Sequence, residues 1–237
     1  MTAKLISLFK AAPEVSPEQF KTYWREILLP DLKKFGIVRA VHHHVIPSDI
    51  REGEGLPVNR WAGVGCYYFD TEAEVRALLA NPDFTEMLRK HAAFLPEVTH
   101  LPVNEVWIYN RDPSHLPLKM FAFFKRKPQF TREYAHNYYR TTHADVGESI
   151  NRNRTVRYIQ NHVLLDYTNP QAEYDYDAGP EIWFKSMEIA LDLFGDTEGM
   201  AILGADEEKF VLRSELLHFL TDEETVFERT PTPALEG

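Results

Sequence analysis

Histidine is the residue type in this chain that points most directly to chemistry, because its side chain titrates near neutral pH. His42, His43 and His44 are consecutive, and His162 recurs in a similar apolar segment later in the sequence. Successive side chains on a strand point to opposite faces, so only His42 and His44 could share one ion. No Asp, Glu or Cys lies between residues 37 and 47, and we therefore expect no dedicated metal centre.

The position of a further histidine comes from an internal repeat. Residues 7–25 (SLFKAAPEVSPEQFKTYWR) align with residues 122–140 (AFFKRKPQFTREYAHNYYR) at a constant spacing of 115 residues. Residues 38–46 align with residues 156–164 at a spacing of 118 residues. Each copy of a repeat is one structural unit, and a period of half the chain predicts two fused domains.

His143 takes the place of Leu28 at the spacing of 115, and Asp145 takes the place of Pro30. An imidazole at a former core position must be hydrogen-bonded or exposed, and it could serve as a general acid or base. Asp145 could orient the ring if the helix ends there. The alternative is a histidine that stabilises a helix C-terminus through the macrodipole.

Each copy is expected to fold as β-α-β-β-α-β, with capping signals such as Ser16-Pro17 at its helix starts. The strands expected in the first copy are residues 4–10, 37–46, 61–69 and 102–109, and those in the second are residues 119–125, 156–165, 181–184 and 223–228. This order is that of the ferredoxin-like α+β sandwich. We predict two such domains, residues 1–110 and 118–229, with a linker at 111–117, a loop at 47–60 and a tail at 230–237.

A ferredoxin-like sheet has helices on one face only, and its other face must be buried elsewhere. The simplest partner is the second copy, so we expect the two sheets to pack face to face as an intramolecular α+β barrel with a lumen. On the second strand of each copy, the more polar set of alternating residues suits that lumen. Candidate catalytic residues are therefore His44, His162 and Tyr158, and candidate substrate-binding residues are His42 and Gln160.

Further candidates for substrate binding lie on the later strands. The aromatic ones are Trp61, Tyr68, Trp107 and Trp183. Glu105 and Glu181 interrupt apolar strands, and burial would raise their pKa and suit proton transfer. Either carboxylate could instead form a structural ion pair with Arg39 or Arg157.

Composition narrows the classes of function. The chain has 237 residues, a hydrophobic content of 44% and a formal net charge of −10, which disfavours nucleic acid or an anionic membrane as partner. Its single cysteine, Cys66, excludes an internal disulfide. No signal peptide, membrane span, GxGxxG fingerprint, P-loop or GxSxG motif is present, so we expect a cytoplasmic protein that uses no nucleotide.

The segment LISLFK followed by SPEQFKTYWREILLP resembles the start of an EthD domain, a family of the dimeric α+β-barrel superfamily. The segment FAFFKRKPQFTREYAHNYYRTTHADV resembles the same motif and keeps the family's histidine as His143. The first copy departs from the motif with Leu28. The resemblance implies that the barrel, built from two subunits in relatives, is intramolecular here, in a monomer or a homodimer.

The resemblance also implies a small aromatic or polyketide-like substrate and histidine acid/base chemistry without a cofactor. We therefore expect a cofactor-independent lyase, isomerase or cyclase, with His143 as the residue carried over from the family motif. One alternative is a cofactor-free monooxygenase or a haem-binding barrel with His44, His162 or His143 as axial ligand. Another is a protein that binds a hydrophobic ligand without chemistry.

Overall fold

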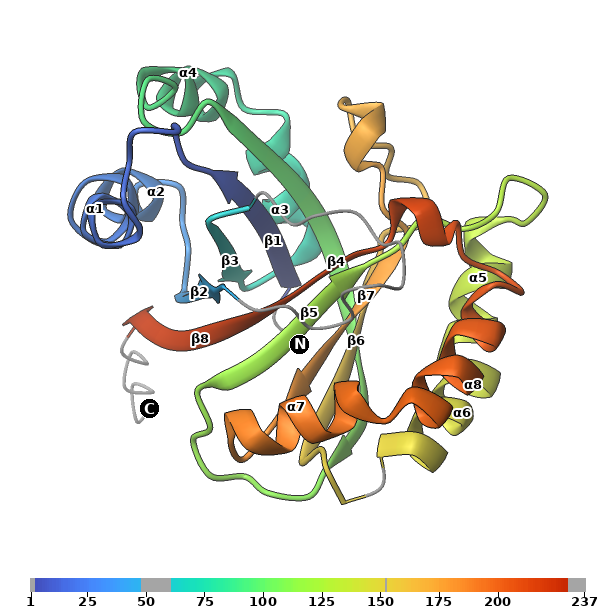
Figure 1. Ribbon diagram of the computed structural model, residues 1–237. Helices are drawn as coiled ribbons and strands as arrows, with labels where there is room; N and C mark the ends of the chain where they lie inside the picture. The colour runs from blue at the N-terminus through green and yellow to red at the C-terminus, as the bar shows by residue number, and fades with distance from the viewer. Residues whose placement is uncertain (1–2, 48–60, 152, 230–237) are drawn as a thin grey trace, which may run out of the picture.

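The computed structural model describes residues 3–47, 61–151 and 153–229, and its eight strands divide equally between the two halves of the chain (Figure 1). The first half holds β1 (Ala3–Lys10), β2 (Arg39–Ile46), β3 (Gly63–Phe69) and β4 (Glu97–Asn110). The second half holds β5 (Leu118–Phe123), β6 (Arg157–Val163), β7 (Ala178–Trp183) and β8 (Leu217–Glu228). The predicted tail, and the predicted loop except Pro47, lie outside the described residues.

The strands form one closed barrel in the order β1-β3-β2-β8-β5-β7-β6-β4, and every pairing is antiparallel. The two halves meet edge to edge where β2 pairs with β8 and where β4 pairs with β6. Closure removes the free strand edges that would otherwise need protection. The predicted mixed fold with an antiparallel barrel is thus confirmed.

Helices cover the outside of the barrel in both halves (Figure 1). Those of the first half are α1 (Pro17–Tyr23), η1 (Trp24–Leu28), α2 (Leu29–Lys33), α3 (Glu72–Leu79) and α4 (Pro82–Lys90). Those of the second half are α5 (Arg132–Tyr138), η2 (Tyr139–His143), α6 (Ala144–Asn151), η3 (Ala172–Tyr174), α7 (Met187–Gly195), α8 (Thr197–Glu207) and η4 (Arg213–Glu215). Ser16 caps α1 in the predicted capping box, with Gln19 N–H donating to Ser16 Oγ at 3.2 Å.

Three strands are longer than the sequence predicts. β4 begins at Glu97, β7 at Ala178 and β8 at Leu217, each several residues before the expected start. The additional residues pair with neighbours in the barrel, as His100 does with Ser7 and Leu217 with Phe123. Polar residues and a proline interrupt the apolar pattern there, and long-range pairing prevails over local propensity.

The side chains that fill the barrel differ from those expected. Val41 and Val163 lie in the apolar cluster inside the barrel, and Asn161 on the same face hydrogen-bonds to interior groups. His42 and Gln160 point outward instead: His42 stacks on Trp24 with ring centroids 3.7 Å apart. The predicted lumen face was therefore wrong for His42, His44, Tyr158, Gln160 and His162. An eight-stranded barrel is just wide enough for side chains to fill, and apolar residues fill much of it here, while the polar set faces the helix layer, where His42 stacks on Trp24.

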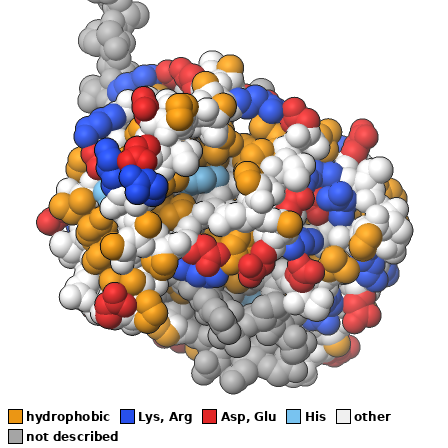
Figure 2. Space-filling view, turned by 90° about the horizontal axis from the view of Figure 1, so that it is seen from above, with side chains coloured by type: hydrophobic (Ala, Val, Ile, Leu, Met, Phe, Trp, Pro, Cys, Tyr) orange, Lys and Arg blue, Asp and Glu red, His pale blue; other side chains and the backbone are white. Residues whose placement is uncertain are grey.

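Acidic and basic side chains are interspersed on the face of the molecule seen in Figure 2, without a large area of one sign. This distribution offers no concentrated positive field for nucleic acid on that face. Within the described parts of the chain, no helix has both the length and the apolar character needed to cross a bilayer.

Candidate functional site

The helix layer of the second half encloses an apolar cavity of about 60 Å³ against the outer side of β5, β6 and β7. The wall is formed by side chains from these strands and from η2, α6, α7 and α8. Among them are Met120, Tyr139, His143, Tyr158, Met200 and Phe210. We call this cavity the second-half pocket. It contains two of the predicted catalytic residues, His143 and Tyr158.

A π-helical turn carries His143 into this pocket. The turn η2 spans Tyr139–His143, and the turn η1 spans Trp24–Leu28 at the same spacing of 115 residues. Turns of this type are rare and occur frequently at functional sites. The turn holds the rings of Tyr139 and His143 with centroids 5.4 Å apart.

His143 is oriented by an aspartate from α8. Its Nδ1 lies 2.8 Å from Asp206 Oδ2, and Asp206 Oδ1 accepts a hydrogen bond of 2.7 Å from Tyr138 Oη and one of 3.1 Å from Lys209 Nζ. Burial opposes ionisation of Asp206, but hydrogen bonds from His143, Tyr138 and Lys209 hold its pKa well below the usual range. Because the ionised carboxylate accepts the Nδ1 proton, Nε2 of the neutral ring is left as the proton acceptor.

Asp206 is the functional residue that sequence reasoning missed, because Asp145 was expected to orient the ring. His143 instead contacts a helix more than sixty positions later. The repeat offered a clue to this contact. Asp206 lies 115 residues after His91, so the two residues occupy equivalent positions in the two copies. His91 Nδ1 lies 2.6 Å from Tyr23 Oη, and Tyr23 corresponds to Tyr138.

Two tyrosine hydroxyls lie in the wall of the second-half pocket. Tyr158 Oη accepts a hydrogen bond of 2.8 Å from Gln160 Nε2, whereas Tyr139 Oη is buried without a hydrogen-bond partner among the described residues. Burial raises the pKa of both tyrosines well above the ordinary value. Both phenols therefore remain neutral and can donate a hydrogen bond to a ligand oxygen.

The other predicted catalytic histidines lie outside the pocket. His162 Nε2 is 3.0 Å from Gln160 Oε1, and burial lowers the pKa of His162 to about 3. His44 belongs to the first half, where it lies 3.5 Å from Glu224, and burial lowers its pKa to about 4. Trp61 is also separate and packs against Tyr174 with ring centroids 5.0 Å apart.

A second cluster of titratable groups lies inside the barrel. Lys4 Nζ contacts Glu105 at 2.8 Å and also pairs with Glu181. Lys119 Nζ lies 2.6 Å from both Glu181 and Glu223. The partners are thus lysines, and the expected pairing of Glu105 or Glu181 with Arg39 or Arg157 was wrong.

Glu181 also differs from expectation in its pKa. Burial alone would raise the pKa of this carboxyl, but the ammonium groups of Lys119 and Lys4 lower it far below the usual range. Glu181 is therefore ionised at every physiological pH. A group held in this way is a poor candidate for proton transfer.

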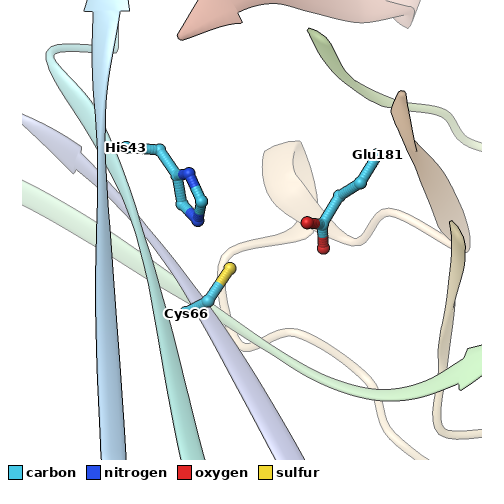
Figure 3. Close-up of side chains that lie close together, drawn as sticks. All are labelled: His43, Cys66 and Glu181. Carbon is cyan, nitrogen blue, oxygen red and sulfur yellow. The ribbon is translucent and has the colours of Figure 1, made fainter. Parts of the chain in front are cut away.

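His43, Cys66 and Glu181 converge inside the barrel, and their potential ligand atoms lie within 4.8 Å of one another (Figure 3). The surroundings disfavour a divalent cation, because two lysine ammoniums already contact Glu181. Burial also raises the pKa of the Cys66 thiol to about 12, away from the thiolate that a metal requires. This donor set does not suit a metal ion.

Most of the remaining predicted substrate-binding residues meet at one mouth of the barrel. They line a cavity of about 480 Å³, and they are Tyr68, Glu105, Trp107, Glu181 and Trp183. We call this cavity the barrel mouth. It lies on the inner side of the strands, whereas the second-half pocket lies on their outer side.

One family model matches part of the second half. Residues 127–214 match the EthD domain. The matched range contains His143 and Asp206, so the predicted resemblance is confirmed for this half. Sequence comparison with curated proteins found no significant match.

Solved structures resemble the whole chain and not only the range that matches the EthD domain. An anthrone oxidase-like protein superposes with a TM-score of 0.64 at 11% identity, covering 99% of this chain and 97% of the other. A protein named as a monooxygenase, from Fusobacterium nucleatum subsp. nucleatum, gives a TM-score of 0.51 at 6% identity, with coverages of 95% and 93%. Chlorite dismutase from Candidatus Nitrospira defluvii gives 0.52 at 10% identity, with coverages of 95% and 91%. Likeness at such low identity shows the fold alone.

Proposed function

We propose that this protein is an enzyme that binds a small hydrophobic, aromatic metabolite in the second-half pocket and transfers a proton on it without a bound cofactor. The observation that carries the proposal is the contact of 2.8 Å between His143 Nδ1 and Asp206 at the wall of an apolar cavity. A histidine oriented by a carboxylate inside such a cavity has the geometry of a general base.

The proposed step uses His143, Tyr139 and Tyr158 from the pocket wall, with Asp206 behind His143. His143 Nε2 accepts a proton from a substrate carbon next to a carbonyl, or from a phenol. The resulting imidazolium stays paired with ionised Asp206, and a neutral hydroxyl of Tyr139 or Tyr158 donates to the substrate oxygen where negative charge develops. Return of the proton to another carbon completes an isomerisation. In a cyclase the carbanion attacks a carbonyl of the same molecule and the proton goes to the new alkoxide, and in a lyase a β-substituent leaves with the electron pair and takes the proton.

The size of the pocket limits the substrate. An apolar cavity of about 150 Å³ holds benzene, and the second-half pocket measures about 60 Å³. Two of its wall residues, Met120 and Met200, are unbranched and adapt easily to a ligand. A single ring therefore enters only if these side chains rotate away.

Haem does not fit this pocket. Sites for drug-sized ligands measure about 300–1,000 Å³, and the second-half pocket is several-fold smaller. The contact with Asp206 occupies only Nδ1 of His143, so the small volume, and not the histidine, excludes haem. We therefore derive no haem chemistry here.

Oxidation by dioxygen is a second candidate outcome of the same proton transfer. The names of two similar structures, an anthrone oxidase-like protein and a monooxygenase, favour it. In such a reaction the deprotonated carbon of a CH₂ group reacts with O₂, and the products are a carbonyl and one water molecule. The co-reactant is dioxygen, and the base is again His143.

The test is proton exchange on a single-ring ketone. Phenylacetone, whose CH₂ group is next to both a ring and a carbonyl, is incubated with the protein in D₂O, and loss of the CH₂ signal is followed by ¹H NMR. We expect exchange above the buffer rate, and a decrease of about 10²–10⁴-fold in His143→Ala, the range for loss of a general base. An oxygen electrode on the same samples separates simple exchange from oxidation.

His91→Gln is the matched control, because His91 contacts Tyr23 and Asp31 in the first half much as His143 and Asp206 meet beside Tyr138. It should exchange at the wild-type rate. Equal rates for His143→Ala and the wild type would show that His143 is structural. Tight retention of phenylacetone without exchange would instead favour a ligand-binding protein.

We further propose that residues 1–110 and 118–229 are two tandem ferredoxin-like domains, joined by 111–117. The element order supports this, since each half follows β-α-β-β-α-β and contributes strands in the same order to the barrel. Separate expression of residues 118–229 tests it. A cooperative unfolding transition of that fragment would support two domains.

A further inference from the structure

The barrel mouth is separated from the second-half pocket by the thickness of the sheet. Neighbouring residues on one strand line the two cavities: Lys119 faces the mouth and Met120 the pocket, and likewise Ile159 and Tyr158. The mouth measures about 480 Å³, within the range of about 300–1,000 Å³ typical of small-molecule sites. It is therefore large enough to be a site of its own.

The repeat places equivalent residues from the two halves around this cavity. The strand registers pair Lys4 with Tyr68 in the first half and Lys119 with Trp183 in the second. The resulting equivalent pairs are Lys4 and Lys119, Arg39 and Arg157, Tyr68 and Trp183, and Glu105 and Glu223. Glu181 breaks the symmetry, because its equivalent is the neutral Cys66.

Two of the three arginines that line the mouth, Arg39 and Arg157, contact no carboxylate among the described residues. The two lysines contact three carboxylates, as described above. Arg39 and Arg157 have no carboxylate partner in the part of the chain that the structure describes: Arg39 lies 5.2 Å from the Tyr68 ring centroid, and Arg157 bonds to Asn110 and to backbone oxygens. Glu228 and Arg229 also line the mouth, and Arg229 pairs with Asp70. The other four cations and the four carboxylates balance, so an anion is favoured by the position of the two guanidiniums that no carboxylate contacts among the described residues.

Buried N–H donors at the mouth also lack partners. Trp183 is only 4% exposed, yet its Nε1 has no hydrogen-bond partner among the described residues, and neither has Arg39 Nε. His43, which is 1% exposed, has no hydrogen-bond partner there for either ring nitrogen. Buried polar groups are normally hydrogen-bonded, so unpaired donors around one cavity indicate an acceptor that occupies it.

Aromatic rings form the rest of the mouth. Trp183 and Tyr68 lie in its wall, and Trp107, which is 55% exposed, also lines it. Rings of this kind stack on a flat ligand, and guanidinium groups pair with a carboxylate through parallel hydrogen bonds. We propose that the barrel mouth is a second ligand site, which binds a small aromatic monocarboxylate with its carboxylate at the arginines and its ring against the tryptophans.

The test compares 2-naphthoate with its neutral isostere 2-naphthamide by isothermal titration calorimetry on the full chain. We expect the carboxylate to bind at least about tenfold more tightly than the amide, and its affinity to fall as salt is raised. Arg39→Gln and Arg157→Gln should each weaken 2-naphthoate binding about tenfold or more. His143→Ala, on the other side of the sheet, and Arg89→Gln, at an exposed pair with Glu86, should leave it unchanged.

Several results would overturn the proposal. They are equal affinity for the amide and the acid, unchanged binding in both arginine variants, no binding of 2-naphthoate at millimolar concentration, and loss of binding in His143→Ala. Should an arginine variant fail to fold, Trp107→Ala replaces it, since this exposed side chain contributes little to folding. We expect Trp107→Ala to weaken 2-naphthoate severalfold, and wild-type affinity would count against the site.

Discussion

The two halves of this protein share one order of strands and principal helices but differ in how they fill the space between the helices and the sheet. In the first half, Trp24 is completely buried and packs on Phe9 and Phe20 with ring centroids 5.0 and 5.1 Å away. Its Nε1 donates a hydrogen bond of 2.9 Å to Tyr67 Oη. Even the strand adapts, because a Cβ atom at Gly63 would lie 2.6 Å from the indole. This interface is a sealed core.

In the second half, the residues on the corresponding helix face have smaller side chains than those of the first half. The pairs at the spacing of 115 are Phe20 and Ala135, Trp24 and Tyr139, Leu28 and His143, and Leu32 and Gly147. These four positions follow one another at intervals of four residues, so they line one side of the helix. The cavity beside His143 is where the missing volume lies.

The polar groups at this interface are incompletely satisfied in both halves. The buried hydroxyl of Tyr67 has a partner in Trp24, whereas that of Tyr139 has none among the described residues. In the first half, neither ring nitrogen of His42, which stacks on Trp24, has a hydrogen-bond partner there. The halves therefore differ chiefly in packing: an indole fills the interface of the first half, and a cavity remains in the second.

The largest effect on stability is expected for Trp24→Ala, which tests the packing of the first half. Removing a fully buried tryptophan should cost about 3–5 kcal/mol in the free energy of unfolding, measured by urea denaturation. The variant should also gain a cavity in the first half, and added indole should restore part of the lost stability. A cost below about 1 kcal/mol would show that the first-half interface is not the sealed core described here.

A smaller effect is expected for Asp206→Asn, which removes the charge that orients His143. Loss of hydrogen bonds to an ionised acceptor should lower stability at pH 7 by about 1.5–3 kcal/mol. Because the folded pKa of Asp206 is depressed, its contribution is present above the unfolded pKa near 4 and is lost as pH falls through the folded pKa. Urea titrations at pH 7 and pH 3 should therefore show wild type and variant converging in acid.

Asp31→Asn is the matched control in the first half. Asp31 also contacts a histidine, His91, but its side chain is 33% exposed. We expect this variant to lose less than about 1 kcal/mol, as exposed pairs do. An equal loss in both variants would remove the distinction between the two carboxylate–histidine pairs.

The architecture could be predicted because it depends on a pattern that the sequence states twice. Repetition of strand and helix signals at constant spacing determined the element order, and His143 was found by comparing the two copies. Asp206 was missed because its contact with His143 joins two helices that are distant in sequence. Helix-to-helix contacts depend on packing, which local patterns do not encode.

The prediction of which side chains of β2 and β6 point into the barrel was wrong for a different reason. Alternation separates Val41 and His43 from His42 and His44 but does not say which set points inward. The expectation that the more polar set faces inward fails on β2 and β6, where Val41 and Val163 join the apolar cluster inside the barrel. Charged residues of the interior gather instead in one ionic cluster at the barrel mouth. The lysines of that cluster were missed, since isolated lysines on strands are usually exposed.

Gly147→Ala should have the smallest effect on stability and the opposite sign. Gly147 lies within α6, where alanine is favoured by about 0.5–1 kcal/mol, and the nearest atom to a new Cβ is Asn151 Nδ2 at 3.8 Å. The variant should be more stable in urea and yet exchange phenylacetone more slowly, because the new methyl group narrows the second-half pocket. Gly36→Ala provides the control: its φ of 85° suits glycine, so alanine there should destabilise without affecting exchange. If Gly147→Ala were more stable and equally active, the space beside His143 would be a packing defect and the contrast between the halves would lose its functional meaning.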